Sequence, residues 1–163
     1  MKKYNIIDNY MPADYSATLL ENFLGENFPW YACHEMVRSN DSINVPYFAH
    51  VIYRDYKPNS DYFNLIIPII EKLNVNSLIR IKVNNYPKHD SIVKHGFHTD
   101  YDNDNIKTCI YYINTNNGGT IIKGEKIVES VQNRALILNS NLLHTSTSQT
   151  NTNYRVNLVI NYM

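Results

Sequence analysis

Hydrophobic and polar residues alternate in short runs from residue 77 to the end of the chain. The runs are rich in β-branched and aromatic residues, and Asn, Gly and Asp separate them, which is typical of strands joined by turns. They read SLIRIKVNNY, IKTCIYYIN, GTIIKG, EKIVES, RALILN and YRVNLVINY. Their close spacing predicts an antiparallel sandwich or barrel.

The first half of the chain has a different pattern. Residues 12–24 begin with Pro and Asp and repeat apolar residues at helical spacing, so they predict a helix. Residues 60–73 predict a second helix, in which Pro68 should cause a kink or a local break. Between them, residues 46–54 read as a strand. The expected class is α+β and mainly β, with N-terminal helices that brace an all-β body.

Length and composition agree with one domain. The chain has 163 residues, of which 44% are hydrophobic, enough to bury a core. We therefore expect a single domain over 1–163, with a support region at 1–76 and a β-rich body at 77–163. No heptads or long apolar helix stripe point to an assembly, so a monomer is expected.

Charge and cysteine content bear on the partners and the compartment. Fifteen basic and fifteen acidic residues give a net charge of zero, which argues against a nucleic-acid or anionic-membrane surface. The longest apolar run, at 65–70, is too short to span a bilayer. Cys33 and Cys109 lie far apart and form no CxxC pattern. Without a signal-peptide pattern, a reducing, cytoplasmic location is expected.

The last strand has one polar and one apolar face. Val156, Leu158 and Ile160 point one way, and the alternate residues from Arg155 to Asn161 point the other. The apolar set indicates packing against a sheet or helix. The polar set indicates either a strand that lines a polar cavity or a solvent-facing edge, and the sequence does not choose between them.

Candidate metal chemistry begins at KHGFHTD, residues 94–100. His98 and Asp100 share a face of an extended chain, whereas His95 does not. With His144, in NLLHTSTS, they would form the two-histidine, one-carboxylate facial triad of non-haem Fe(II) oxygenases, which leaves positions open for a bidentate co-substrate and dioxygen. An HxD pair is a weak signal alone, because a histidine near a turn is more often a polar surface residue.

An arginine makes the pattern more specific. Arg155 follows His144 by eleven residues and lies on the polar face of the final strand. Its guanidinium can form a two-pronged, charge-assisted pair with a dicarboxylate whose other end chelates the iron.

With these elements together, the chain resembles the 2-oxoglutarate- and Fe(II)-dependent dioxygenases of the prolyl-hydroxylase-like type. HTD, KTCIYYINTNNGGT, NR, HTSTSQT and NYRVNLVINY follow one another in that family's order, over roughly residues 77–162. The asparagine-rich INTNNG resembles compact versions from bacteria and bacteriophages, which implies the cytoplasm of a bacterium or of a phage-infected cell. The resemblance implies a double-stranded β-helix, or jelly roll.

The resemblance also implies roles for individual residues. His98, Asp100 and His144 would hold the iron, and Arg155 would bind the distal carboxylate of 2-oxoglutarate. Further co-substrate contacts would come from Tyr112, Tyr86, Ile110 and Asn157. Tyr112 and Tyr86 are two of 14 tyrosines, so simple packing is the alternative for both. His95 stands where those hydroxylases carry a tyrosine.

Two further segments have alternative interpretations. Gly118 and Gly119 predict a turn with positive φ. The aromatic-rich segment 28–62 is either a substrate-facing loop or packing of the scaffold, and we favour packing.

The expected activity is therefore a hydroxylase that uses Fe(II), 2-oxoglutarate and O2, with ascorbate as a supporting reductant. Its substrate would be a protein, peptide or amino-acid side chain. Alternatives are a non-catalytic jelly-roll binding module with a vestigial metal site, and an oxygenase of a small metabolite or nucleobase. A metal-dependent hydrolase is less consistent, because it would need a general base near HTD and would leave Arg155 without a role.

Overall fold

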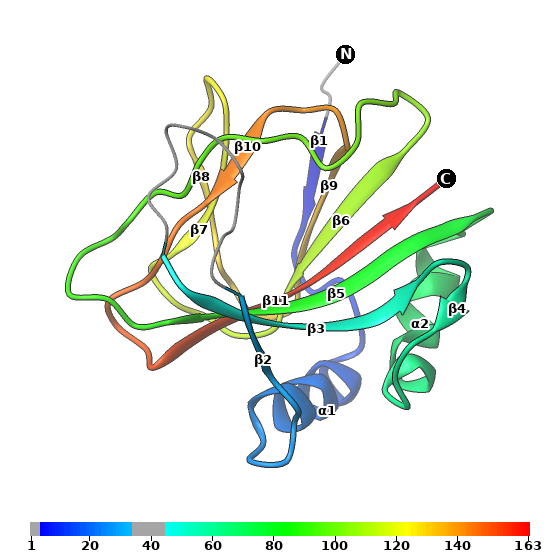
Figure 1. Cartoon of the computed structure of the whole chain (residues 1–163), viewed down its shortest axis with the longest axis horizontal. Helices are drawn as coiled ribbons and strands as arrows, with labels where there is room; N and C mark the ends of the chain where they lie inside the picture. Colours follow the sequence, from blue (N-terminus) through cyan, green and yellow to red (C-terminus); the bar gives the residue numbers. More distant parts are fainter. Residues whose placement is uncertain (1–3, 34–44) are drawn as a thin grey trace.

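Two antiparallel β-sheets form the body of the computed structural model, which describes residues 4–33 and 45–163 (Figure 1). The larger sheet has the order β1-β9-β6-β11-β5-β3-β2, and β4 pairs with β3 as its eighth strand. Its strands are β1 (Tyr4–Ile7), β2 (Tyr31–Cys33), β3 (Tyr47–Arg54), β4 (Lys57–Pro58), β5 (Leu78–Pro87), β6 (Lys107–Tyr112), β9 (Arg134–Asn139) and β11 (Tyr154–Tyr162). The smaller sheet has the order β10-β7-β8, with β10 (His144–Ser146), β7 (Gly119–Ile122) and β8 (Ile127–Glu129).

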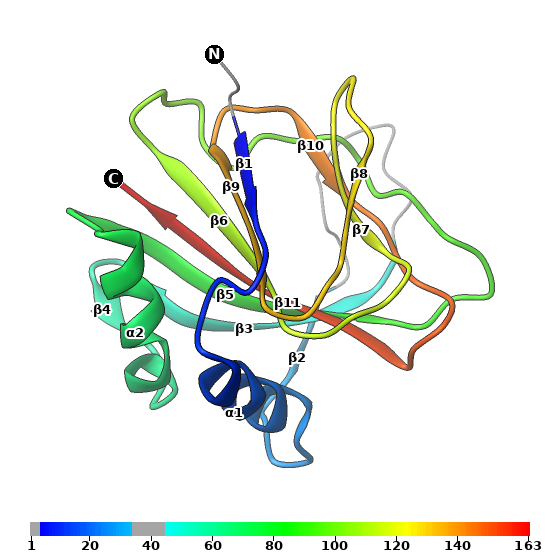
Figure 2. The ribbon, with the colours of Figure 1, turned by 180° about the vertical axis from the view of Figure 1, so that it is seen from behind.

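This arrangement confirms the predicted jelly roll. The smaller sheet lies across from the β3–β5–β11 part of the larger sheet, as both views show (Figures 1 and 2). All six runs predicted after residue 77 form strands. The described residues of the support region 1–76 contribute strands to the same sheet, because β1 pairs with β9 and β3 pairs with β5.

Two helices cover the outer face of the larger sheet, α1 (Ala13–Leu24) and α2 (Phe63–Leu73) (Figure 2). The second begins three residues later than predicted, and it runs without a break through Pro68. Ile66 and Ile69 of α2 are fully buried, so packing of its apolar face offsets the backbone hydrogen bond that proline cannot donate. No helix in the described part of the chain is long and apolar enough to cross a membrane.

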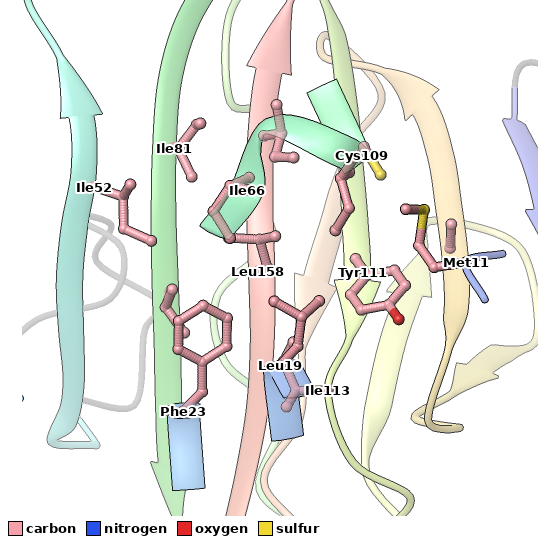
Figure 3. Packing of buried hydrophobic residues seen from close by; sticks show 14 of the residues in the cluster. Met11, Leu19, Phe23, Ile52, Ile66, Ile81, Cys109, Tyr111, Ile113 and Leu158 are labelled. Atoms are coloured by element: carbon pink, nitrogen blue, oxygen red, sulfur yellow. The ribbon is translucent and has the colours of Figure 1, made fainter. Parts of the chain in front are cut away.

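The main core lies between these helices and the sheet (Figure 3). Ile81 of β5 and Leu158 of β11 belong to the same buried cluster as Phe23 of α1 and Ile66 of α2. Leu158 has no exposed surface, and truncating such a leucine to alanine costs about 2–5 kcal/mol of stability. This packing fixes which way the alternate residues of β5 and β11 must point.

The other face of β11 lines the interior of the jelly roll. Asn157 and Asn161 are buried, and the Arg155 side chain has no exposed surface. Register pairs Arg155 with Tyr86 and Asn161 with Arg80 across to β5. Of the two alternatives for this polar face, the cavity is correct and the solvent-facing edge is wrong.

Candidate metal and co-substrate site

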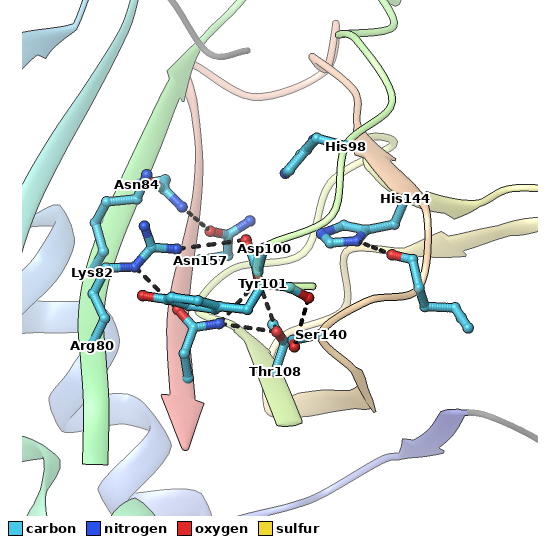
Figure 4. Close-up of polar contacts among 12 residues, drawn as sticks. Arg80, Lys82, Asn84, His98, Asp100, Tyr101, Thr108, Ser140, His144 and Asn157 are labelled. Carbon is cyan, nitrogen blue, oxygen red and sulfur yellow. Dashed lines mark hydrogen bonds and ion pairs between the residues drawn. The ribbon is translucent and has the colours of Figure 1, made fainter. Parts of the chain in front are cut away.

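The three predicted metal ligands meet inside the jelly roll. Ligand atoms of His98, Asp100 and His144 all lie within 4.8 Å of one another. His98 and Asp100 stand on the segment that links β5 to β6, and His144 begins β10. A pair of 2.9 Å backbone hydrogen bonds joins His98 to His144. This bridge sets the two rings side by side, with centroids 4.6 Å apart (Figure 4).

Backbone carbonyls orient both imidazole rings. The Nδ1 of His144 lies 2.8 Å from the carbonyl oxygen of Leu142, and the Nδ1 of His98 lies 3.2 Å from that of Gly96. A carbonyl oxygen can only accept, so each Nδ1 carries a proton, which leaves Nε2 as the nitrogen that can bind a metal. Burial lowers the pKa of His98, and the nearby His144 lowers it further. The neutral, metal-binding form of His98 is therefore favoured.

The Asp100 carboxylate is held by polar groups on three strands. Its Oδ2 accepts hydrogen bonds from Thr108 Oγ1 at 2.8 Å and from Asn161 Nδ2 at 3.0 Å. Its Oδ1 lies 3.5 Å from an Arg80 nitrogen. Burial alone would raise the pKa of Asp100, but His144, Arg80 and the two hydrogen bonds outweigh it, so that this pKa lies below its ordinary value. The carboxylate is thus charged and fixed in orientation.

Two imidazoles and one carboxylate fit a divalent transition metal. This donor set, with ligands on one side of the ion, is the facial triad of non-haem Fe(II) proteins. Hydrogen bonds behind each ligand are the outer contacts that such sites use to orient ligands. The residues present therefore fit Fe(II).

Arg155 supplies a buried cation at the other end of β5 and β11. Its guanidinium donates to Ser146 Oγ at 2.8 Å and to the Gly119 carbonyl oxygen at 3.1 Å, and it lies 4.9 Å from the centre of the Tyr86 ring. Among the described residues, no carboxylate forms an ion pair with it, and its Nε has no hydrogen-bond partner. Burial lowers the pKa of Arg155. A buried guanidinium without a counter-charge favours an anionic ligand.

Gly118 makes room for this arginine and Gly119 makes room for β8, for a reason other than the one predicted. Neither Gly118 nor Gly119 has positive φ, so that prediction was wrong. A Cβ on Gly118 would lie 2.5 Å from the Ser148 carbonyl oxygen and 2.9 Å from Arg155 Cδ, and a Cβ on Gly119 would lie 2.2 Å from the Val128 carbonyl oxygen. Close approach of neighbouring backbone segments, not backbone conformation, requires glycine here.

The other predicted co-substrate residues divide into two groups. Tyr86, Ile110 and Asn157 line a cavity of about 60 Å³ that also contains the three metal ligands. Tyr112 is fully buried behind it, and its hydroxyl donates to Thr120 Oγ1 at 2.9 Å. Burial raises the pKa of Tyr112 to about 12, so its hydroxyl keeps its proton. Arg155 also lies behind the lining, through its contacts with Tyr86 and Ser146.

His95 is not part of the metal cluster, in agreement with the alternation of the sequence. Its ring stacks on Tyr86 at 5.6 Å between centroids, and the residue is buried. Its contribution is to pack behind a side chain that lines the cavity.

The aromatic segment 28–62 is largely packing, as favoured. Phe28 belongs to the core cluster with Phe23, and Tyr62 packs against it. Tyr47 is the exception, because it lines the cavity and stacks on Tyr86. Residues 34–44 of this segment lie outside the described residues.

Sequence reasoning missed three polar residues of β5 that line the cavity, Arg80, Lys82 and Asn84. They alternate with buried apolar residues and share a face with Tyr86, so the period-two pattern could have found them. Lys82 Nζ donates to the Tyr47 hydroxyl at 3.5 Å. Burial, and then the charge of Arg80, lower the pKa of Lys82 to about 8.

Comparison with known proteins identifies the fold. No family model matches the sequence, and no curated protein matches it. A 2OG-Fe(II) oxygenase family protein from Burkholderia pseudomallei matches over 98% of this chain and 85% of its own, with a TM-score of 0.72 and 13% identity. A Pseudomonas putida prolyl-4-hydroxylase matches over 98% of this chain and 92% of its own, with a TM-score of 0.63 and 15% identity.

A third solved structure is a prolyl hydroxylase in complex with a hypoxia inducible factor peptide fragment, from Trichoplax adhaerens. It matches over 98% of this chain and 83% of its own, with a TM-score of 0.61 and 15% identity. The chain thus has the jelly-roll fold of the 2-oxoglutarate- and Fe(II)-dependent oxygenases, a class that includes prolyl hydroxylases.

Proposed function

We propose that this protein is an Fe(II)- and 2-oxoglutarate-dependent dioxygenase that hydroxylates its substrate. The observation that carries the proposal is the pairing of two features in one jelly roll. One is the cluster of His98, Asp100 and His144, and the other is the buried Arg155 with no carboxylate partner among the described residues. A hydrolase or a simple metal site would give Arg155 no purpose.

Each residue has a defined task in this scheme. His98, Asp100 and His144 hold the metal, while Arg155 receives the distal carboxylate of 2-oxoglutarate. Bound Fe(II) and 2-oxoglutarate together supply the oxidising chemistry that uses O2 and releases succinate and CO2. Thr108 and Asn161 keep the Asp100 carboxylate in place through their hydrogen bonds.

Two considerations favour hydroxylation of a peptide or amino-acid side chain. Asp100 occupies the carboxylate position that related halogenating enzymes leave open for halide. Solved structures with this fold include proteins described as prolyl hydroxylases, one of them in complex with a peptide. The proposal also includes that the protein is a monomer and that ascorbate supports its turnover.

Anaerobic titration tests the metal and co-substrate together without a known substrate. Adding 2-oxoglutarate to the Fe(II)-loaded protein should produce the visible charge-transfer band of the chelate. Asp100→Ala and His98→Ala should abolish the band, and His89→Ala, outside the cavity, should keep it. A band that persists in both ligand variants would refute the metal site.

Succinate formation then separates an enzyme from a binding module. Fe(II), ascorbate and O2 should give slow succinate release from 2-oxoglutarate, which a chelator abolishes. If the band forms but no succinate appears with any of a panel of peptides and amino acids, a non-catalytic module is the better description.

A further inference from the structure

Lys82 brings a second cation into the cavity, and this cation has little to bind. It stands two residues from Arg80 on the same face of β5, and both side chains line the space beside the metal ligands (Figure 4). Among the described residues, its only hydrogen bond is a long one, 3.5 Å, to the Tyr47 hydroxyl. Among the described residues, no carboxylate lies within 4 Å of its Nζ. An ammonium group has three donors, so most of this group's capacity is unused.

The charges around the cavity do not balance. Arg80 and Lys82 line it and Arg155 lies behind it, whereas Asp100 is the only acidic residue among the described residues of its lining. The two positive charges of Fe(II) and the two negative charges of 2-oxoglutarate cancel, so loading the site leaves the excess unchanged. Placing positive charge in a narrow, partly desolvated space favours a ligand that brings negative charge.

The tasks of the other two cations are already defined by their contacts. Arg80 lies 3.5 Å from Asp100 and donates to Asn161 Oδ1 at 3.0 Å. Arg155 lies at the Tyr86 end of β5, and Lys82 stands four residues away on that strand. Lys82 is therefore the cation that is free to meet the primary substrate.

A hydrogen-bond acceptor lies next to it. Asn84 follows Lys82 on the same face and lines the same cavity. Its amide donates to Asn157 Oδ1 at 3.1 Å, but its own Oδ1 is buried without a partner among the described residues. A cation beside a free carbonyl oxygen matches a carboxylate that has an N–H donor close to it.

We infer that the primary substrate carries a carboxylate with a neighbouring N–H donor, and that Lys82 binds that carboxylate while Asn84 accepts from the N–H. This inference rests on the proposed function and narrows its substrate to α-amino acids, either free or at the C-terminal end of a peptide. Fixing the carboxylate beside the metal ligands would hold the substrate side chain in one orientation toward the reaction centre.

Ligand-observed NMR on the protein loaded with Zn(II) and 2-oxoglutarate tests this inference without turnover. Loading blocks the Arg155 end, so added acids cannot bind there. The probes are the twenty common amino acids, their N-acetyl derivatives and their primary amides. At least one acid should bind, and its amide should bind 10-fold or more weakly. Binding of the N-acetyl acid identifies a peptide end as the source, and binding of the free acid alone identifies a free amino acid.

Variants of Lys82 assign the effect to this side chain. Lys82→Met should weaken binding of the acid about 10- to 100-fold, the range of one charge-assisted hydrogen bond. Lys82→Arg should restore most of it. Lys88→Met removes an exposed lysine just beyond the same strand and should change nothing. Thermal unfolding verifies that each variant is folded.

Three results would overturn the inference. The first is equal binding of acids and amides, and the second is no binding of any acid. The third is a Lys82→Met variant that loses as much affinity for 2-oxoglutarate as for the acid, which would place Lys82 in the co-substrate site. Failure of the proposed function looks different. In that case the unaltered protein shows no metal-dependent binding of 2-oxoglutarate, while binding of acids to Lys82 can still be measured.

Discussion

Asn161 donates its side-chain amide to Asp100 Oδ2 at 3.0 Å, across 61 positions of sequence. The same amide contacts Thr108 Oγ1, and its carbonyl oxygen accepts from Arg80. One asparagine on the last strand thus connects all the groups that orient the metal-binding carboxylate. The carboxylate is positioned by the sheet, although it stands on an irregular segment.

Replacing this asparagine should weaken metal binding. Asn161→Leu keeps the approximate volume but removes the donor to Asp100 and leaves Arg80 without its acceptor. We expect Fe(II) or Zn(II) affinity to fall about 10- to 100-fold, the usual effect of losing such an outer contact. Metal titration measures this, with the exposed Asn153→Leu as the control. Unchanged affinity would show that Thr108 alone orients the carboxylate.

Arg155→Lys should separate charge from shape at the co-substrate end. Lysine keeps the positive charge but loses the planar fork of donors that reaches Ser146 and Gly119. The affinity for 2-oxoglutarate should fall about 10- to 100-fold, while metal affinity stays the same. Calorimetric titration of the metal-loaded protein provides both values. Arg134→Lys, whose arginine pairs with the exposed Asp8, should behave as wild type, and equal affinity in both variants would contradict the assignment.

Gly118→Ala should affect stability and co-substrate binding together. The added Cβ would collide with the Ser148 carbonyl oxygen and with Arg155 Cδ, so the backbone at Ser148 or the arginine must shift. A loss of about 1–3 kcal/mol in unfolding free energy is expected from such overpacking, with weaker binding of 2-oxoglutarate. Gly124→Asn is the matched control, because that glycine has positive φ and open space around it. Denaturant unfolding measures the loss in both variants. If Gly118→Ala and Gly124→Asn lose the same free energy of unfolding, the close approach at Gly118 is not what requires glycine.

The stability of the metal-free protein should fall in acid because of His95. Burial, and then the positive charges of Arg155, His89 and His98, lower the pKa of His95 to about 4. Its Nδ1 is buried without a partner among the described residues. The folded state holds the neutral form, so its contribution is present above the unfolded pKa near 6.5 and is lost as the pH falls from there toward 4.

Because of this difference in the pKa of His95, the free energy of unfolding should fall by roughly 2 kcal/mol between pH 7 and pH 5. Urea unfolding at both pH values gives this fall for the wild type and for His95→Phe, which keeps a ring against Tyr86. The difference between the two falls is the contribution of His95. The variant should lose less stability than the wild type over this range. Parallel losses would mean that other groups, such as His98, carry the acid sensitivity.

The sequence predicted those parts of the molecule that follow a strict period. Alternation in the final strand separated the core-facing Leu158 from the inward-facing Arg155 and Asn161. The predicted ligands His98, Asp100 and His144 also come together as expected. These features depend on residue type at fixed spacing, which a single sequence displays directly.

Other parts depend on long-range pairing that no local pattern displays. The edge strand β1 is mostly exposed, and β10 has only three residues, so neither stands out. Gly118 is explained by the backbone at Ser148, thirty residues further along the chain, and by the Arg155 side chain. Pro68 predicts a break in the helix from the sequence alone, because the packing of α2 that offsets its effect depends on the rest of the fold. Arg80 and Lys82 look like ordinary solvated cations until the fold turns their face of β5 inward.

The polar face of β11 fixes the distance between the two ends of the site. Arg155 and Asn161 stand six residues apart on one paired strand, which fixes their Cα atoms about 20 Å apart. Co-substrate anchor and metal support are therefore not two independently adjustable features. Deleting one residue between them would turn one of the two outward into the helices, so sequence change in this strand is restricted to exchanges that preserve its length.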